Sequence, residues 1–185
     1  MIAKGHDFPD VTLVGVISAD VGLGLADFRS NERTFQLLTQ VAGRAGRGVL
    51  TGEAIIQSLL PSHYAITLAT TQDYRAFYET EIKYRRAMRY PPQIAMVNVV
   101  VRGRTFEEAM AGARQLADAT RGEKGFALLG PAPAPLTKLR GEHRAQFFLK
   151  GTNRRMMREA LQLALTRTPS LAKRVSVDVD PLTML

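Results

Sequence analysis

The sequence predicts an α/β protein in two parts: a strand–helix–strand unit built on a parallel sheet, then an α+β domain with the β-α-β-β-α-β order of ferredoxin-like folds. Three observations support this prediction. Apolar residues make up 45% of the 185 residues, which is enough for a packed core. Short β-branched runs alternate with segments whose apolar residues recur at helical spacing. The paired prolines at residues 91–92 separate two regions of different pattern.

The first part begins with a strand predicted over residues 11–17 (VTLVGVI). Because almost every residue of this run is apolar, we expect it to be buried on both faces of a parallel sheet. A helix is predicted from about residue 32 to residue 45, with Ser30 or Asn31 as its cap, since either side chain can accept a hydrogen bond from the first turn. The run at 52–60 (GEAIIQSLL) predicts the second strand.

A helical connector is predicted next, beginning after Pro61. Its pattern extends over residues 62–89 and divides near 71–72, because Asp73 can begin a new helix. The paired prolines cannot continue the helix and mark its end. From these breaks we predict three regions: residues 1–60, a helical connector over 61–92, and a carboxyl-terminal α+β domain over 93–185.

The second part alternates strands and helices, and both helices begin at good capping residues. Thr105 and Glu108, three residues later, form a capping box, and Asn153 is the other candidate cap. In order, the predicted elements are a strand over 94–103, a helix over 105–120, a strand over 126–135 that runs into a proline-rich loop, a strand over 145–151, a helix over 153–168 and a strand over 174–180.

The chain is basic, with 25 Lys and Arg against 17 Asp and Glu and a formal net charge of +8. This surplus favours a polyanion such as nucleic acid as a partner, although ordinary solubility charge would account for it too. The sequence has no cysteine and three widely spaced histidines, so it predicts no disulfide and no metal site. It has no apolar run of about 18 residues, so we expect no membrane contact and predict a cytoplasmic protein.

Residues 40–48 (QVAGRAGRG) place two arginines among small residues. If this segment is helical, Gln40, Arg44 and Arg47 stand at i, i+4 and i+7 and share one face. Gly43 and Gly46 add no side chains beside the arginines, so another surface can come close. Two forked guanidinium groups on such a backbone suit a phosphoryl group whose charge grows as it is transferred. The alternative is that arginines near a helix carboxyl terminus only interact favourably with the helix dipole.

QVAGRAGRG matches the Q-x-x-G-R-x-G-R signature, motif VI, of superfamily 2 helicases, and MIAKGHDFPDVTLVGV upstream is similar to their motif V. The segment DFRSNERTFQLLTQ, the YPP run and the terminal VDVDP complete an ordered set. Over essentially its whole length the chain resembles the primosomal protein N′ family, the replication-restart DNA helicases of bacteria. The resemblance implies that residues 1–60 are the carboxyl-terminal part of a second, RecA-like motor lobe.

The resemblance also implies a role for each residue of motif VI, which faces ATP in such helicases. Gln40 would orient near the γ-phosphate and its attacking water. Arg44 would contact the γ-phosphate, and Arg47 would be the arginine finger. Gly43 belongs to the same nucleotide-binding segment.

Motif V would link the nucleotide site to the DNA. By resemblance, Gly5 and Asp7 lie in the loop that touches both the strand backbone and the nucleotide cleft. Lys4 and His6 are then candidate contacts to DNA phosphates. The alternative for His6 is that a loop histidine only packs or caps.

Three features of the helicase family are missing from the sequence. It contains neither a G-x-x-x-x-G-K-[ST] phosphate loop nor a D-E-x-[HD] motif for Mg²⁺, and it has no cysteine-rich zinc region. The resemblance implies that ATP and Mg²⁺ are bound mainly by a missing amino-terminal motor lobe, which this chain would contact, and that zinc is expected only in the missing upstream region. We therefore expect no ATPase activity from the chain alone.

A second basic segment lies in the carboxyl-terminal domain. The predicted loop PAPAPLTKLRGEHRA holds Lys138, Arg140, His143 and Arg144, and its prolines would present these cations with little ordering cost. The resemblance implies a domain similar in fold to a small ribosomal-subunit protein, which helps to bind DNA or partner proteins at a fork. The alternative is a solvated hairpin whose charge serves solubility.

Two hypotheses about function remain open. By resemblance, the chain is the carboxyl-terminal portion of an ATP-dependent 3′-5′ DNA helicase that recognises stalled or branched forks and restarts replication by primosome assembly. Its partners would be DNA forks, single-stranded DNA, primosome proteins and single-strand-binding proteins. The other hypothesis is a non-catalytic DNA- or protein-binding module, and the intact motif VI argues for the first.

Overall fold

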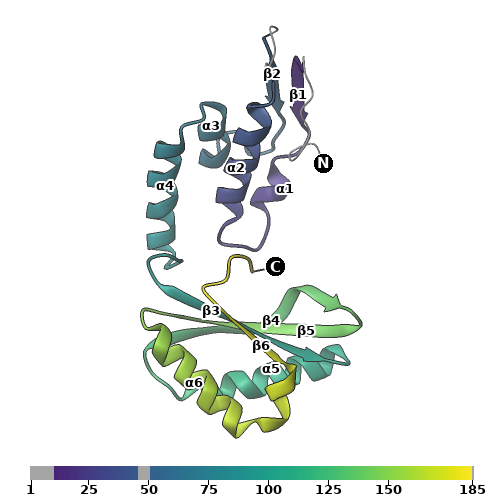
Figure 1. Cartoon of the computed structure of the whole chain (residues 1–185), viewed down its shortest axis with the longest axis vertical. Coiled ribbons are helices and arrows are strands. Elements are labelled where there is room, and N and C mark those ends of the chain that lie inside the picture. The colour runs from purple at the N-terminus through teal and green to yellow at the C-terminus, as the bar shows by residue number, and fades with distance from the viewer. Residues whose placement is uncertain (1–10, 46–50, 185) are drawn as a thin grey trace. The chain divides into compact units, whose positions relative to one another are not determined.

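The computed structural model describes residues 11–45 and 51–184 and divides into two compact units, Met1–Tyr84 and Arg85–Leu185 (Figure 1). Each unit has its own hydrophobic cluster and its own sheet, with two parallel strands in the first and four antiparallel strands in the second. The predicted α/β class is confirmed. Among the described residues, no helix combines the length and the apolar character that crossing a membrane requires.

The amino-terminal unit pairs β1 (Leu13–Val16) in parallel with β2 (Glu53–Ile56), which confirms the predicted parallel sheet. The prediction that the first strand is buried on both faces is wrong. Exposed and half-buried residues alternate along β1 because, within the described residues, it has one neighbouring strand and one face against the core. Leu13 is 58% exposed, whereas Val16 packs against the hydrophobic cluster.

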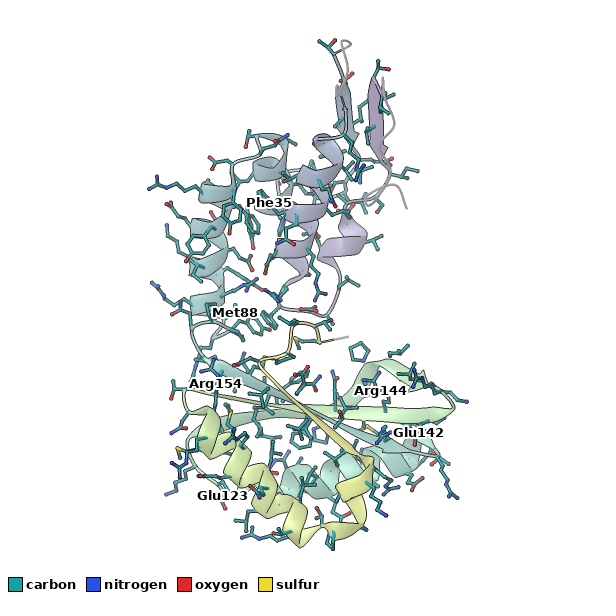
Figure 2. The ribbon with its side chains drawn as sticks, in the orientation of Figure 1. Phe35, Met88, Glu123, Glu142, Arg144 and Arg154 are labelled. Atoms are coloured by element: carbon teal, nitrogen blue, oxygen red, sulfur yellow. The ribbon has the colours of Figure 1, made fainter. Side chains whose placement is uncertain are left out.

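The core of this unit forms between α2 (Ser30–Ala42), α3 (Tyr64–Thr70) and α4 (Tyr74–Ala87). The rings of Phe35 on α2 and Phe77 on α4 stack with their centroids 4.1 Å apart, and Figure 2 shows Phe35 pointing toward α4. A polar network joins the same helices, since the Tyr64 hydroxyl donates to Glu81 Oε2 at 2.6 Å and accepts from Asn31 Nδ2 at 2.7 Å. Burial raises the pKa of Tyr64, and so does its hydrogen bond to Glu81, so the hydroxyl remains a donor.

Helix α2 begins earlier than predicted, at Ser30, and neither Ser30 nor Asn31 caps it. The residue before the helix is Arg29, whose side chain makes no capping hydrogen bond. The amide of Asn31 donates to Tyr64, 33 residues further along the chain, so a tertiary contact takes the side chain that local sequence assigned to the cap.

The predicted division of the connector into two helices is confirmed. Helix α3 ends at Thr70, and Asp73 Oδ1 accepts a hydrogen bond from Ala76 N at 2.9 Å at the start of α4. The start of α3 has a cap that the sequence did not suggest, because His63 Nδ1 accepts from Ala65 N at 3.2 Å.

The carboxyl-terminal unit confirms the predicted β-α-β-β-α-β order. Its four strands form an antiparallel sheet in the order β4-β5-β3-β6. The elements are β3 (Ala95–Gly103), α5 (Phe106–Arg121), β4 (Phe126–Leu139), β5 (Glu142–Gly151), α6 (Arg154–Arg167), the 3₁₀ helix η1 (Pro169–Arg174) and β6 (Val175–Val179).

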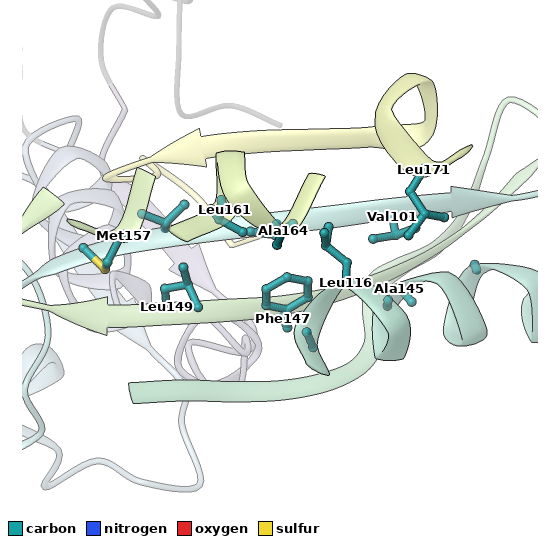
Figure 3. Close-up of a cluster of buried hydrophobic side chains, with 14 of the residues drawn as sticks. Val101, Leu116, Ala145, Phe147, Leu149, Met157, Leu161, Ala164 and Leu171 are labelled. Carbon is teal, nitrogen blue, oxygen red and sulfur yellow. The ribbon is translucent and has the colours of Figure 1, made fainter. Parts of the chain in front are cut away.

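The core of this unit lies between the two central strands and helices α5 and α6, which cover the same face of the sheet (Figure 1). Alternate residues of β3 and β5 point into it, as a strand period of two requires. Figure 3 shows the fully buried Phe147 and Leu149 of β5 beside Leu116 of α5 and Met157 of α6.

Both predicted caps of this unit are confirmed. Thr105 Oγ1 accepts from Glu108 N at 3.1 Å, and Asn153 Oδ1 accepts from Met156 N at 3.1 Å. The capping box is shifted by one residue, because the Glu108 carboxylate accepts from Arg104 N at 2.8 Å rather than from Thr105 N.

The prediction that the proline-rich segment is a loop is wrong. Strand β4 continues through the prolines to Leu139, with irregular register between Leu129 and Ala132 and between Pro133 and Lys138. β4 is an edge strand, so one side of its backbone needs no partner, and a residue without an N–H is tolerated there.

Candidate nucleotide and nucleic-acid sites

The carboxyl end of α2 carries the described part of the predicted nucleotide-facing motif. Gln40 lies in the last turn of the helix and is exposed. The helix ends at Ala42 with Gly43 as its C-cap, so the predicted extension to residue 45 is wrong. Arg44 follows in a turn, where its N–H donates to Val41 O at 3.0 Å, and it is half-buried. Gln40 and Arg44 are therefore not one helical turn apart on a continuous helix, because a tighter turn begins after Gly43.

The structure thus places two of the three side chains predicted to face ATP, Gln40 and Arg44, at one end of one helix. Arg47 lies outside the described residues, as do the motif V candidates Lys4, Gly5, His6 and Asp7. The roles given to these five by resemblance stay predictions.

Helix α2 is fixed along its length by contacts that precede the motif. The buried carboxylate of Asp27 pairs with Arg33 Nη1 at 2.9 Å. Asn31 bonds to Tyr64, and Phe35 stacks in the core. These contacts hold α2 in place up to the turn before Gln40.

A carboxylate that the sequence analysis did not single out joins the two strand ends. Asp20, the first residue of α1 (Asp20–Leu23), accepts from Leu59 N at 2.9 Å and from Ser58 Oγ at 2.7 Å, just beyond β2. These hydrogen bonds lower the pKa of Asp20, so the carboxylate is ionised at neutral pH. The sequence carried a signal for this contact, because Asp20 and Ser58 follow the apolar residues of β1 and β2, and polar residues that follow neighbouring parallel strands meet at the carboxyl edge of the sheet.

The four residues predicted to bind DNA lie at one end of the ribbon formed by β4 and β5. Arg140 and Gly141 make its two-residue turn, with φ of 51° and 86°, as a type I′ hairpin requires. Lys138 pairs across the ribbon with His143. Lys138 and Arg140 are exposed, whereas His143 and Arg144 are half-buried. The structure therefore gathers all four on a strand ribbon.

A further cation at this end comes from β3, because Arg102 lies opposite Arg144 in the sheet. Arg102 Nη1 pairs with Glu142 Oε2 at 3.3 Å, and Nη2 donates to Lys173 O at 3.0 Å. Figure 2 labels Arg144 and Glu142 on the ribbon. Arg102 could not be found from local sequence, since it sits in a buried strand 40 residues before its partner Glu142.

The class of this protein follows from a comparison with family models. The model described as the primosomal protein N C-terminal domain matches residues 86–182, just over half of the chain. This chain belongs to the primosomal protein N family, which confirms the resemblance noted in the sequence.

Particular relatives carry the name replication restart protein PriA. The chain is 40% identical to that of Bacillus subtilis (strain 168), a match that covers 100% of the chain and 24% of the relative. It is 38% identical to that of Chlamydia muridarum (strain MoPn / Nigg), over 99% of the chain and 25% of the relative. It is 36% identical to that of Haemophilus influenzae (strain ATCC 51907 / DSM 11121 / KW20 / Rd), a match that covers 98% of the chain and 25% of the relative. The chain spans about a quarter of the length of these relatives.

Proposed function

We propose that the chain is the carboxyl-terminal part of an ATP-dependent 3′-5′ DNA helicase that recognises stalled or branched replication forks and restarts replication by primosome assembly. The observation that carries this proposal is the QVAGRAGRG motif at the end of α2, in a chain that matches replication restart proteins over its full length. Partner DNA would include forks and single strands, and partner proteins would include the primosome and single-strand-binding proteins. Such a role places the protein in the cytoplasm.

In this proposal the chain supplies the cationic half of a phosphoryl-transfer site. Gln40 orients the attacking water, Arg44 contacts the γ-phosphate, and Arg47 stabilises the charge that develops in the transition state. Among the described residues, no group of three His, Cys, Asp or Glu could hold a metal ion. We assign the metal and most ATP contacts to a motor lobe outside this sequence.

The arrangement of the elements supports finer fold assignments. The strands β1 and β2 pair in parallel, and helix α2 lies between them in the sequence. This arrangement fits part of a RecA-like lobe. The order β4-β5-β3-β6, with both helices on one face, fits a ferredoxin-like domain. Residues 1–60, 61–92 and 93–185 would then be the motor part, the connector and the carboxyl-terminal domain.

A direct test of the proposal compares the chain alone with a longer protein that includes the upstream motor lobe. We expect no DNA-stimulated ATP hydrolysis from the 185 residues, because they lack the phosphate loop, and clear hydrolysis with 3′-5′ unwinding from the longer protein. Phosphate release and strand-displacement assays measure the two activities. Hydrolysis by the chain alone, or none by the longer protein, would contradict the proposal.

The ribbon cations are proposed to contact DNA phosphates. Replacing Lys138, Arg140 and Arg144 together with alanine should lower affinity and make the slope of log K against log salt shallower by about 2–3, at 0.7–0.9 per phosphate contact. A matched control removes three exposed arginines of the helices, Arg114, Arg158 and Arg167, and should change the slope little. Fluorescence anisotropy over a salt series measures both variants. An equal change in the two would assign the effect to net charge alone.

The second candidate function is a non-catalytic DNA- or protein-binding module. It is favoured by two leucines beside the ribbon cations, Leu136 and Leu139, which are 47% and 45% exposed. Apolar side chains at that exposure suit a protein surface better than phosphates. A complex of the ribbon that is insensitive to salt would support this reading.

A further inference from the structure

A groove on α2 is lined by amide side chains and an exposed tyrosine. Its volume is about 760 Å³, and its wall comes from α2 and from the turn that joins α3 to α4. All of its lining residues belong to the amino-terminal unit. They are Arg33, Phe35, Gln36, Leu37, Thr39, Gln40, Gln72 and Tyr74.

An aromatic series leads from the core to this groove. Phe77 stacks on Phe35 at 4.1 Å, and the ring of Tyr74 follows with its centroid 6.3 Å from that of Phe35. The contact with Phe35 supports the ring of Tyr74 from the core side. Because Tyr74 is 65% exposed, much of its ring remains accessible. A flat apolar ring at the wall of an open groove suits stacking with another flat ring.

The polar groups of the groove match the edge of a nucleobase. A glutamine amide offers both donors and an acceptor, as base edges do. Gln36 Nε2 donates to Glu32 Oε1 at 3.3 Å, which leaves its amide oxygen to accept. The hydroxyl oxygen of Thr39 is buried and makes no hydrogen bond with the described residues. Because that oxygen is closed off from solvent, it takes no part in the contacts with a group bound in the groove.

The charge of the groove favours a base that belongs to a strand over a free nucleotide. Its one cation is Arg33, whose guanidinium already pairs with Asp27 at 2.9 Å. A di- or triphosphate needs several cations or a backbone cradle, which the groove lining does not provide. In a strand the phosphates can stay in solvent, and next to Tyr74 the exposed Arg75 pairs with the exposed Glu79 at 3.3 Å.

We propose that this groove binds one unpaired nucleobase of a DNA strand, stacked on Tyr74 and hydrogen-bonded by Gln36 and Gln72. The inference rests on the proposed function for the choice of DNA as the strand. Gln40 also lines the groove, but it is left to the nucleotide site. The proposal gives the amino-terminal unit a DNA contact that depends on the base, in contrast to the phosphate contacts of the ribbon.

The test separates base from phosphate with two oligonucleotides of equal length, oligo(dT) and an abasic strand with the same phosphates. The chain should prefer oligo(dT), and Tyr74→Ala should weaken oligo(dT) binding about tenfold while leaving the abasic strand unchanged. Tyr78→Ala is the matched control, since Tyr78 lies on the same helix, is 53% exposed and does not line the groove. It should leave both affinities unchanged. Gln72→Gly, which suits the φ of 53° there, should weaken oligo(dT) binding severalfold.

Tyrosine emission gives an independent readout, because the chain has five tyrosines and no tryptophan. Oligo(dT) should quench part of this emission, and Tyr74→Phe should bind normally but lose that part. The proposal would be overturned by equal affinity for the two strands or by equal effects of Tyr74→Ala and Tyr78→Ala. It would also be overturned if dTMP bound as tightly as oligo(dT), or if the chain formed a dimer that only Tyr74→Ala disrupts. Absence of ATP hydrolysis in the longer protein, with the base preference of the chain intact, would count against the helicase proposal alone.

Discussion

Replacing Arg47 with alanine in the longer protein is expected to lower the rate of DNA-stimulated ATP hydrolysis by about 10³–10⁵-fold. An arginine finger acts on charge that appears only in the transition state, so its loss lowers kcat while ATP binding changes little. Arg47→Lys should recover only a small part of the rate, because a point charge cannot replace the planar fork of a guanidinium.

Single-turnover hydrolysis and equilibrium ATP binding separate these two effects. Arg114→Ala is a suitable control, because Arg114 is exposed on α5 and has no part in the motif. It should leave turnover within about twofold of the parent protein. A rate for Arg47→Ala that stays close to the parent rate would remove Arg47 from the catalytic site, while the other motif VI residues would need their own test.

Replacing Phe147 with alanine is expected to destabilise the carboxyl-terminal unit by about 3–5 kcal/mol. Phe147 is fully buried at the centre of β5 and pairs in register with Val99 of β3, so helices α5 and α6 cannot close over the space it leaves. A loss of this size approaches the whole stability of a typical domain.

Urea unfolding followed by far-ultraviolet circular dichroism measures the change. Leu163→Ala is the control, since Leu163 lies on α6 but is 41% exposed, and it should cost about 0.5 kcal/mol. If Phe147→Ala does not fold, Phe147→Leu offers a smaller loss of about 1–1.5 kcal/mol that can still be measured. Equal losses for Phe147→Leu and Leu163→Ala would show that the core is not centred on Phe147.

Features set by a few adjacent residues were predictable from the sequence. The caps at Thr105 and Asn153, and the new helix at Asp73, depend only on a short side chain and the N–H groups two or three residues later. The strand–helix order of the carboxyl-terminal unit was predictable for the same reason, since periodicity reports which face of each element is buried.

Features set by distant contacts were not predictable. Asn31 is a good cap in isolation, but Tyr64 takes its amide. The prolines of β4 read as a loop because local sequence does not reveal that the strand lies at a sheet edge. The position of two candidate residues was predictable, since the motif placed Gln40 and Arg44 near the end of one helix, and their role stays a prediction. The groove was not predictable, because its lining joins Gln72 and Tyr74 to distant residues of α2.

The hydrogen bonds that Asp20 accepts beyond β2 have a mechanical consequence for helix α2. The β1–β2 ladder and the hydrogen bonds from Asp20 to Ser58 and Leu59 pin together the two ends of residues 20–58, the stretch that carries α2. A loop with tethered ends cannot swing outward as an arm. Helix α2 is therefore held close to β1 and β2, and a change in the position of Gln40 at its end requires a rearrangement within the tethered stretch itself.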